Sequence, residues 1–313
     1  QGLLQTVKMP KNTLQPKFKS NDHSVQKRYD AIVIGVGAMG AAACYYLAKE
    51  GVEVLGLEQF DIPHDKGAHA GQSRIIRQAY FEHPDYVPLL QKAYQNWQEL
   101  EDATGAEIFV RTGLHYLGKP DHDQMKGMHL SAGTYHIRVD TLSETDIQQQ
   151  YPQLRIPGDC ERLFEPDAGF LTPERAVRLY ADMARRHGAS IQTGVKVSSW
   201  QQTPEGFEVF TSAGAYTAKK LVFTAGAWTG QLVPPLSSSL EVTLQTVAWV
   251  TPQRPAFFEL GQLPCWVIAE EDQPGVYYGF PSLPPGKFDG PAGFKLGHHY
   301  RGPATEPDNP ERV

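Results

Sequence analysis

The chain has 313 residues, of which 41% are hydrophobic and 20% are charged, and its formal net charge is −6. These totals suit a globular protein of one large or two medium-sized domains, and they give no reason to expect nucleic acid or an anionic membrane as a partner. The three cysteines, Cys44, Cys160 and Cys265, form no C-x-x-C pair, so neither a disulfide framework nor a zinc site is predicted.

Residues 1–28 are polar and basic, with few apolar residues and no periodicity, and we interpret them as a disordered leader. Reduced cysteines predict an intracellular protein, in the cytoplasm. An organellar address, including a peroxisome, is the alternative that the sequence leaves open.

Residues 29–58 have the order strand, glycine turn, helix, strand. The β-branched run AIVIG predicts a strand ending at Gly35, a helical pattern covers residues 39–49, and an apolar strand covers residues 52–57. The same apolar stretch, residues 31–48, is long enough for a membrane span, but its glycine turn and the charged segment that follows argue against one.

Three glycines of the turn have the spacing G-x-G-x-x-G. Gly35 permits the sharp turn, Gly37 lets the backbone approach a pyrophosphate, and Gly40 allows the helix to pack closely on the strand. This pattern predicts a dinucleotide-binding unit of the Rossmann type.

Two further features of this unit face the same ligand. The amino end of the helix, at Ala38 and Met39, offers free N–H groups and the positive end of the helix dipole to phosphates. Glu58 follows the second strand, 23 residues after Gly35, where a carboxylate can accept hydrogen bonds from ribose hydroxyls.

The remaining chain alternates helices and strands before strands take over. A helix is expected from Pro84 or Asp85, and another is expected with Thr172 as its cap, Pro173 at its first position and Gly188 as its stop. Strands are expected at 108–117, 191–200, 207–211, 216–218 and 220–226, and then at 240–250, 265–270, 276–281 and 293–300. The run at 220–226 suggests that the chain returns there to the nucleotide-binding domain.

Seven features occur in a fixed order: the glycine motif, Glu58, a Pro63-His64 loop, GQSRIIRQAY, LFEPDAGFL, VYYGFPS and GFKLGHH. This series resembles the monomeric sarcosine oxidase family of flavoproteins, which includes N-methyl-tryptophan oxidase and L-pipecolate oxidase. The resemblance covers nearly the whole chain from Tyr29 onward and implies FAD as the cofactor.

The resemblance also implies an α/β fold with two discontinuous domains. Residues 29–85 and 145–232 would form a Rossmann-like FAD-binding domain. Residues 86–144 and 233–313 would form a substrate domain built mainly on an antiparallel β-sheet.

Further cofactor-binding residues follow from the resemblance. Ser73 stands where the family often has threonine, and Arg74 looks like the arginine beside the flavin ring. Val197 and Gly226 are expected at the cofactor as well. Relatives often have a histidine where Ala70 stands here, and His69 is the candidate to replace its flavin contact.

Arg77 looks like the arginine that holds the substrate carboxylate, which a guanidinium can do with two parallel charge-assisted hydrogen bonds. An isolated arginine is more often a surface or ion-pair residue. The context IIR, with Arg74 nearby, favours the functional interpretation.

Lys295, in GFKLGHH, looks like the lysine that meets the flavin and activates oxygen, since a fixed ammonium stabilises negative charge on reduced oxygen. His299 matches a histidine near the substrate, and Tyr278 matches a tyrosine that lines the pocket; both could equally be packing residues. His298 and His299 are neighbours on a strand and point to opposite faces, so no metal site is expected.

The implied activity is FAD-dependent oxidation of an N-methyl or cyclic secondary amino acid to an imine, with O2 reduced to H2O2. The expected partners are a small amino acid and O2. Family members continue beyond the position of Val313 through a cysteine that bonds the flavin and a segment that covers it. The alternatives are that this part was removed, that a separate partner chain carries it, or that the sequence is a fragment with an open flavin site. A non-catalytic flavin-binding protein and an NAD-linked dehydrogenase are the alternatives.

Overall fold

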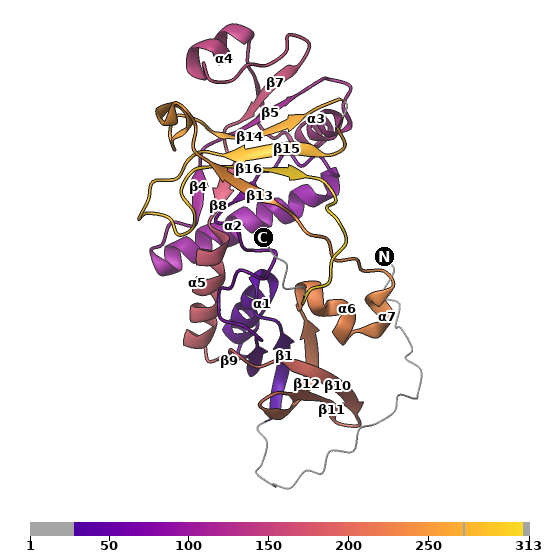
Figure 1. Ribbon diagram of the computed structural model, residues 1–313. Helices are drawn as coiled ribbons and strands as arrows, with labels where there is room; N and C mark the ends of the chain where they lie inside the picture. Colours follow the sequence, from indigo (N-terminus) through magenta and orange to yellow (C-terminus); the bar gives the residue numbers. More distant parts are fainter. Residues whose placement is uncertain (1–27, 272, 309–313) are drawn as a thin grey trace.

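The computed structural model describes residues 28–271 and 273–308. Most of the predicted leader, residues 1–27, therefore lies outside the described residues. Two large sheets organise the chain, the six-stranded one in the lower part of Figure 1 and the seven-stranded one in the upper part.

The six-stranded sheet has the order β10-β11-β12-β1-β2-β9. Its strands are β1 (Arg28–Ile34), β2 (Val54–Leu57), β9 (Ser190–Gln192), β10 (Val197–Thr203), β11 (Gly206–Thr211) and β12 (Gly214–Phe223). The neighbours β12, β1, β2 and β9 are parallel, whereas β10, β11 and β12 form antiparallel pairs. The parallel pairing of β12 with β1 agrees with the predicted return of the chain to the nucleotide-binding unit.

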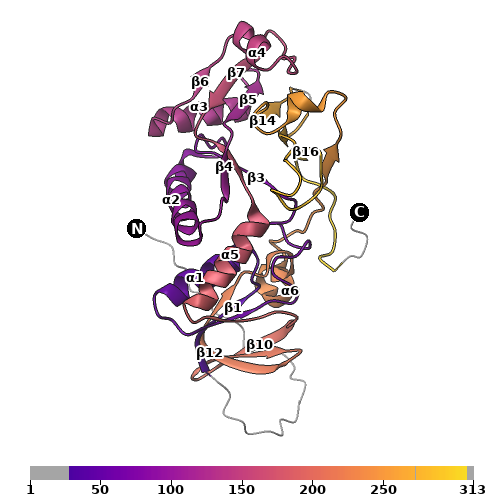
Figure 2. The same cartoon turned by 90° about the vertical axis from the view of Figure 1, so that its left-hand side faces the viewer.

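Helices cover one face of this sheet. α1 (Ala38–Lys49) and α5 (Pro173–Arg186) lie side by side on it, and α2 (Val87–Thr104) packs nearby (Figure 2). Their contacts form a core cluster with Cys44, Tyr45 and Tyr180 buried in it. A mainly parallel sheet with covering helices is the Rossmann-like architecture that the glycine motif predicts.

The seven-stranded sheet has the order β13-β16-β15-β14-β5-β7-β6. Its strands are β5 (Leu114–Gly118), β6 (Asp140–Thr141), β7 (Glu161–Glu165), β13 (Val247–Val250), β14 (Cys265–Ala269), β15 (Val276–Phe280) and β16 (Phe294–His299). All neighbours are antiparallel except β14 and β5, which are parallel. The sheet is therefore mainly antiparallel, as expected.

A small sheet of β3 (Arg74–Ile76), β8 (Gly169–Leu171) and β4 (Phe109–Arg111) lies between the two large ones. The other helices are η1 (Pro84–Tyr86), α3 (Asp123–Tyr135), α4 (Glu144–Gln150), η2 (Gly226–Trp228), α6 (Thr229–Leu232), α7 (Pro234–Ser237) and η3 (Pro255–Phe258).

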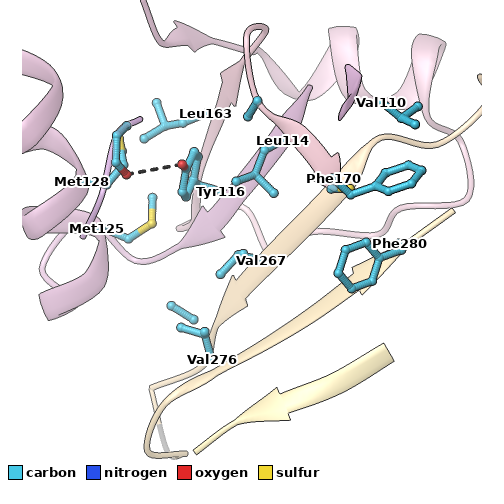
Figure 3. Close-up of a cluster of buried hydrophobic side chains, with 14 of the residues drawn as sticks. Val110, Leu114, Tyr116, Met125, Met128, Leu163, Phe170, Val267, Val276 and Phe280 are labelled. Atoms are coloured by element: carbon cyan, nitrogen blue, oxygen red, sulfur yellow. Dashed lines mark hydrogen bonds between the residues drawn. The ribbon is translucent and has the colours of Figure 1, made fainter. Parts of the chain in front are cut away.

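α3 and the small sheet pack on the seven-stranded sheet and form a shared core with it (Figure 3). Leu114, Met128 and Phe170 are fully buried there, and Phe280 joins them from β15. Tyr116 is buried with its hydroxyl donating to Glu165 Oε2 at 2.7 Å, so this apolar core also contains a buried carboxylate.

Several predicted elements differ in the structure. The strand expected at 240–250 is confined to Val247–Val250, and the runs 216–218 and 220–226 belong to one strand, β12, which ends at Phe223. Thr172 does not cap α5 with its side chain; its hydroxyl donates to Ile108 O at 3.3 Å instead, which ties the helix start to the neighbouring segment.

The predicted domain boundaries stay a prediction. β7 lies in residues 145–232, which are predicted to belong to the FAD-binding domain, but it pairs with β5 in the seven-stranded sheet. Residues 31–48, which are apolar and long enough for a membrane span, form most of β1, the glycine turn and most of α1. Within the described ranges, no helix combines the length and the hydropathy needed to cross a bilayer.

Candidate active site

The glycine turn between β1 and α1 has space for an added side chain at only one of its three glycines, Gly37. Gly35 has a φ of +92°, and a Cβ there would lie 2.6 Å from Thr224 O. A Cβ on Gly40 would lie 1.8 Å from Gly35 O. A Cβ on Gly37 would meet only the His69 ring, at 3.4 Å, so the protein itself leaves room in front of this residue.

A cavity of about 460 Å³ opens in front of this turn, at the carboxyl ends of β1 and β2. It lies in the size range of small-molecule sites and at the edge where doubly wound sheets bind dinucleotides. Most of the predicted cofactor residues line it: Gly35, Gly37, Ala38, Met39, Glu58, His69, Val197 and Gly226. Gly40 packs behind the turn, and Ser73 and Arg74 lie outside this cavity.

Glu58 is fixed at the end of β2. Its side chain is buried, Oε2 accepts the Val36 N–H at 2.7 Å, and Oε1 accepts the Phe60 N–H at 3.0 Å. Burial raises the pKa of this carboxyl group, and the backbone N–H groups oppose that shift. The carboxylate is therefore held rigidly at the cavity wall, where a ribose can reach it.

His69 supplies a buried polar atom without a partner. The residue is 6% exposed, and its Nε2 has no hydrogen-bond partner among the residues that the structure describes. Burial lowers the pKa of His69, and the neighbouring His64 lowers it further. A neutral imidazole with an unpaired nitrogen at the cavity fits a ligand with hydrogen-bonding groups.

Lys295, on β16, lies in a second group of residues, outside the cavity of the glycine turn. Its side chain is 1% exposed, and Nζ donates to Ser73 O at 2.8 Å, to Ser73 Oγ at 3.2 Å and to Gly71 O. The rings of Phe280 and Trp249 lie 4.5 and 5.6 Å from Nζ. Burial, with the positive charge of Arg74, lowers the pKa of Lys295 to about 7.

Strand register brings the other predicted residues of β15 and β16 to the face of Lys295. Phe280 is paired with Lys295, and Tyr278 is paired with Gly297. Side chains two residues apart on a strand share a face, so Lys295, Tyr278 and His299 point to the same side of the sheet. His299 lies at the exposed end of β16, away from the buried part of this face.

The structure separates the two arginines. Arg74 lies at the turn that Lys295 contacts, and it donates to Ser73 O at 2.8 Å and to Ala70 O at 2.5 Å. Arg77 forms an ion pair with Glu82 and lies over the rings of Tyr80 and Phe81, each 4.4 Å away.

Three residues of the Lys295 site were missed by the sequence interpretation. Glu174 Oε1 accepts the N–H groups of Gly71 and Gln72, at 2.7 and 2.9 Å. Gln72 Oε1 accepts from Trp249 Nε1 at 2.9 Å. Glu174 has no local signal of its own, because an acid in the first turn of a helix is expected for the helix alone. Gln72 lies in the GQSRIIRQAY motif, but nothing local links it to Trp249.

The Rossmann-like sheet, the glycine turn and the cavity define a dinucleotide-binding protein. The model of the family described as FAD dependent oxidoreductase matches residues 30–313. The chain belongs to this FAD-dependent oxidoreductase family. Its cofactor is therefore FAD, and the NAD-linked alternative is wrong.

Relatives with known names agree with the sequence resemblance. The chain is 36% identical over 293 residues to a monomeric sarcosine oxidase of Bacillus sp. (strain B-0618), covering 91% of this chain and 72% of that protein. It is 33% identical over 287 residues to an N-methyl-L-tryptophan oxidase of Yersinia pestis (strain Pestoides F), covering 89% of this chain and 72% of that protein. FAD-dependent amine oxidation is the activity that these relatives share.

Solved structures show the same fold. NikD, an amino acid oxidase essential for nikkomycin biosynthesis, has a TM-score of 0.74 at 23% identity, over 92% of this chain and 74% of that chain. Glycine oxidase from Geobacillus kaustophilus has a TM-score of 0.66 at 20% identity, over 88% of this chain and 72% of that chain.

Proposed function

We propose that the protein oxidises N-methyl or cyclic secondary amino acids, of the sarcosine type, to imines and reduces O2 to H2O2. The amine loses two electrons and two protons, O2 gains both, and water hydrolyses the imine. The names of the relatives support this substrate class. The observation that carries the proposal is the buried Lys295, held by the Gly71–Ser73 turn on the sheet face that also carries Tyr278.

The chain's residues fit FAD at the cavity of the glycine turn. The free N–H groups at the start of α1 would face the pyrophosphate, because no side chain caps this helix. Glu58 would accept hydrogen bonds from a ribose, and the unpaired Nε2 of His69 would bond to the cofactor. When bound, FAD supplies a two-electron acceptor that O2 can reoxidise.

Arg77 would bind the substrate carboxylate and thereby orient the amine. Its guanidinium has the right shape for two parallel hydrogen bonds to a carboxylate, and its side chain is 12% exposed. Because Glu82 pairs with this guanidinium, a substrate carboxylate has to take the place of the Glu82 carboxylate. That exchange keeps the partly buried positive charge paired.

Lys295 would hold a positive charge where oxygen is reduced. Its three oxygen acceptors fix the ammonium, so that no reorganisation is needed when negative charge develops on oxygen. The flanking rings of Phe280 and Trp249 exclude water from one side of the ammonium, and Tyr278 would line the adjoining substrate space.

The test is anaerobic reduction of the FAD-loaded protein by sarcosine, N-methyl-L-tryptophan and pipecolate, with glycine as the matched primary amine. Bleaching of the flavin absorbance by the secondary amines, and much slower bleaching by glycine, is expected. Faster reduction by glycine would overturn the substrate class. No reduction by any amine would favour a non-catalytic flavin-binding protein.

A further inference from the structure

Glu174 and Lys295 hold the same turn from opposite sides. Glu174 lies in the first turn of α5, and its Oε1 accepts the consecutive N–H groups of Gly71 and Gln72, at 2.7 and 2.9 Å. Lys295 Nζ donates to the carbonyl groups of Gly71 and Ser73. The peptide group between Gly71 and Gln72 therefore binds both side chains: its N–H donates to Glu174, and its C=O accepts from Lys295.

The conformation of this turn needs such support. Gln72 has a φ of +72°, which residues with side chains rarely adopt, and Gly71 has a φ of +111°. Two successive N–H groups that converge on one oxygen form an anion-binding concavity. Without an acceptor there, the two N–H groups would be left unpaired in a partly buried place, and the backbone would be free to relax.

The turn also carries the aromatic wall beside Lys295. Gln72 Oε1 accepts from Trp249 Nε1 at 2.9 Å, and Gln72 Nε2 donates to Pro291 O at 3.1 Å. The Trp249 ring lies 5.6 Å from Lys295 Nζ. A shift of the turn would therefore move both the oxygen acceptors of the ammonium and one of the rings that cover it.

We infer that Glu174 is a positioning residue for Lys295: its carboxylate fixes the Gly71–Ser73 turn, whose oxygen atoms hold the ammonium in place. The inference rests on the proposed role of Lys295 in the oxygen reaction. The charged groups that act on this ammonium are Arg74, which opposes the protonated form, and Glu174, which favours it. Cys265 is the other titratable group nearby, and burial raises the pKa of its thiol to about 12, so it stays neutral.

The first test is the rate constant with which the reduced enzyme reacts with O2. Lys295→Met sets the loss that follows from removing the ammonium. Glu174→Ala should lose a comparable factor, roughly tenfold or more, and the double variant should lose no more than Lys295→Met alone, because residues that act through each other are not additive. If reduced Lys295→Met reacted with O2 at the normal rate, the proposed role of Lys295 in the oxygen reaction would be wrong, and the fault would lie with the proposed function and not with the positioning role.

Glu101 provides the matched control, because its Oε1 also accepts two consecutive N–H groups, of Ile108 and Phe109, at 2.6 and 2.8 Å. Glu101→Ala should therefore leave the oxygen reaction unchanged. If Glu101→Ala slowed it as much as Glu174→Ala, the effect would be a general loss of structure, and the positioning role would be wrong.

Glu174→Gln separates charge from hydrogen bonding, and it tests the inference if Glu174→Ala does not fold. Its amide oxygen can still accept both N–H groups, but the negative charge that favours the ammonium is gone. The pH at which the oxygen reaction loses half its rate should therefore move to a lower value. Because the positioning role needs only the accepting oxygen, the rate below this midpoint should stay near that of the wild type, and a loss there as large as that of Lys295→Met would contradict the inference.

A second readout needs no turnover. Acetic anhydride labels unprotonated, accessible amines, and mass spectrometry gives the labelling rate of Lys295 itself. Glu174→Ala should raise this rate several-fold, because the released turn uncovers Nζ, and Glu101→Ala should not. Equal protection of Lys295 in the wild type and in Glu174→Ala would overturn the inference.

Discussion

Arg77 and Glu82 form an ion pair with two contacts from one nitrogen: Nη2 lies 3.2 Å from Oε1 and 3.1 Å from Oε2. The guanidinium also lies over Tyr80 and Phe81, and its buried Nε has no hydrogen-bond partner in the described part of the chain. The proposed substrate-binding arginine is thus engaged by an acid five residues away, with one polar atom still unpaired.

Glu82→Gln is expected to strengthen binding of a carboxylate substrate or of a carboxylate inhibitor such as acetate. The substrate no longer competes with a charged side chain for Arg77. Because Glu82 is 35% exposed, the gain should be modest, about two- to fivefold in Kd. Titration of the flavin spectrum with the inhibitor measures it, and weaker binding would contradict this arrangement.

Arg77→Ala should lose substrate affinity and turnover while keeping its flavin. A lost charge-assisted hydrogen bond costs about 1.5–3 kcal/mol, which corresponds to roughly 10- to 150-fold in kcat/KM. Arg111→Ala is the control, because Arg111 is 60% exposed and pairs with the exposed Asp167 at the surface. Normal oxidation of amines by Arg77→Ala would show that another residue holds the carboxylate.

Gly37→Ala should fold normally but bind FAD roughly tenfold more weakly, a loss of about 1.4 kcal/mol. The added methyl group meets His69 at an ordinary contact distance of 3.4 Å, yet it projects where the pyrophosphate would approach. Gly133→Ala, in α3 with open space around it, is the control. Isothermal titration of the apoproteins with FAD compares them, and equal affinities would mean that the cofactor lies elsewhere.

The oxygen reaction should slow as the pH rises through about 7. The pKa of Lys295 lies near that value, well below the ordinary 10.5, so the ammonium loses its proton and its charge above it. Stopped-flow reoxidation over pH 6–9 measures the effect. Lys295→Met should show no step in this range, and the same step in that variant would assign the titration to another group.

Local patterns in the sequence predict the glycine turn, α1, β2 and Glu58, because these parts depend on close neighbours in the chain. The α/β fold with a Rossmann-like sheet and FAD as its cofactor are confirmed. The roles of Lys295, Arg77 and the other site residues stay predictions. The cavity is lined by most of the predicted cofactor residues, and the strand register places Lys295, Tyr278 and His299 on one face of the sheet.

The missed features all depend on contacts between distant segments. Glu174 reaches Gly71 across 103 residues, and Gln72 reaches Trp249 across 177. Thr172 resembles a helix cap locally, but its hydroxyl bonds to Ile108, 64 residues earlier. Single-sequence patterns contain no signal for such pairs, since each side chain also suits a purely local role.

The most direct test combines both halves of the proposed reaction in one sample. FAD-loaded protein is bleached anaerobically with one equivalent of sarcosine or pipecolate, air is then admitted, and H2O2 is measured against flavin. Complete bleaching, return of the flavin absorbance and one H2O2 per flavin are predicted. If air did not restore the flavin absorbance, or restored it without forming H2O2, the protein would not be an oxidase. If the amine did not bleach the flavin at all, the proposed substrate class would be wrong.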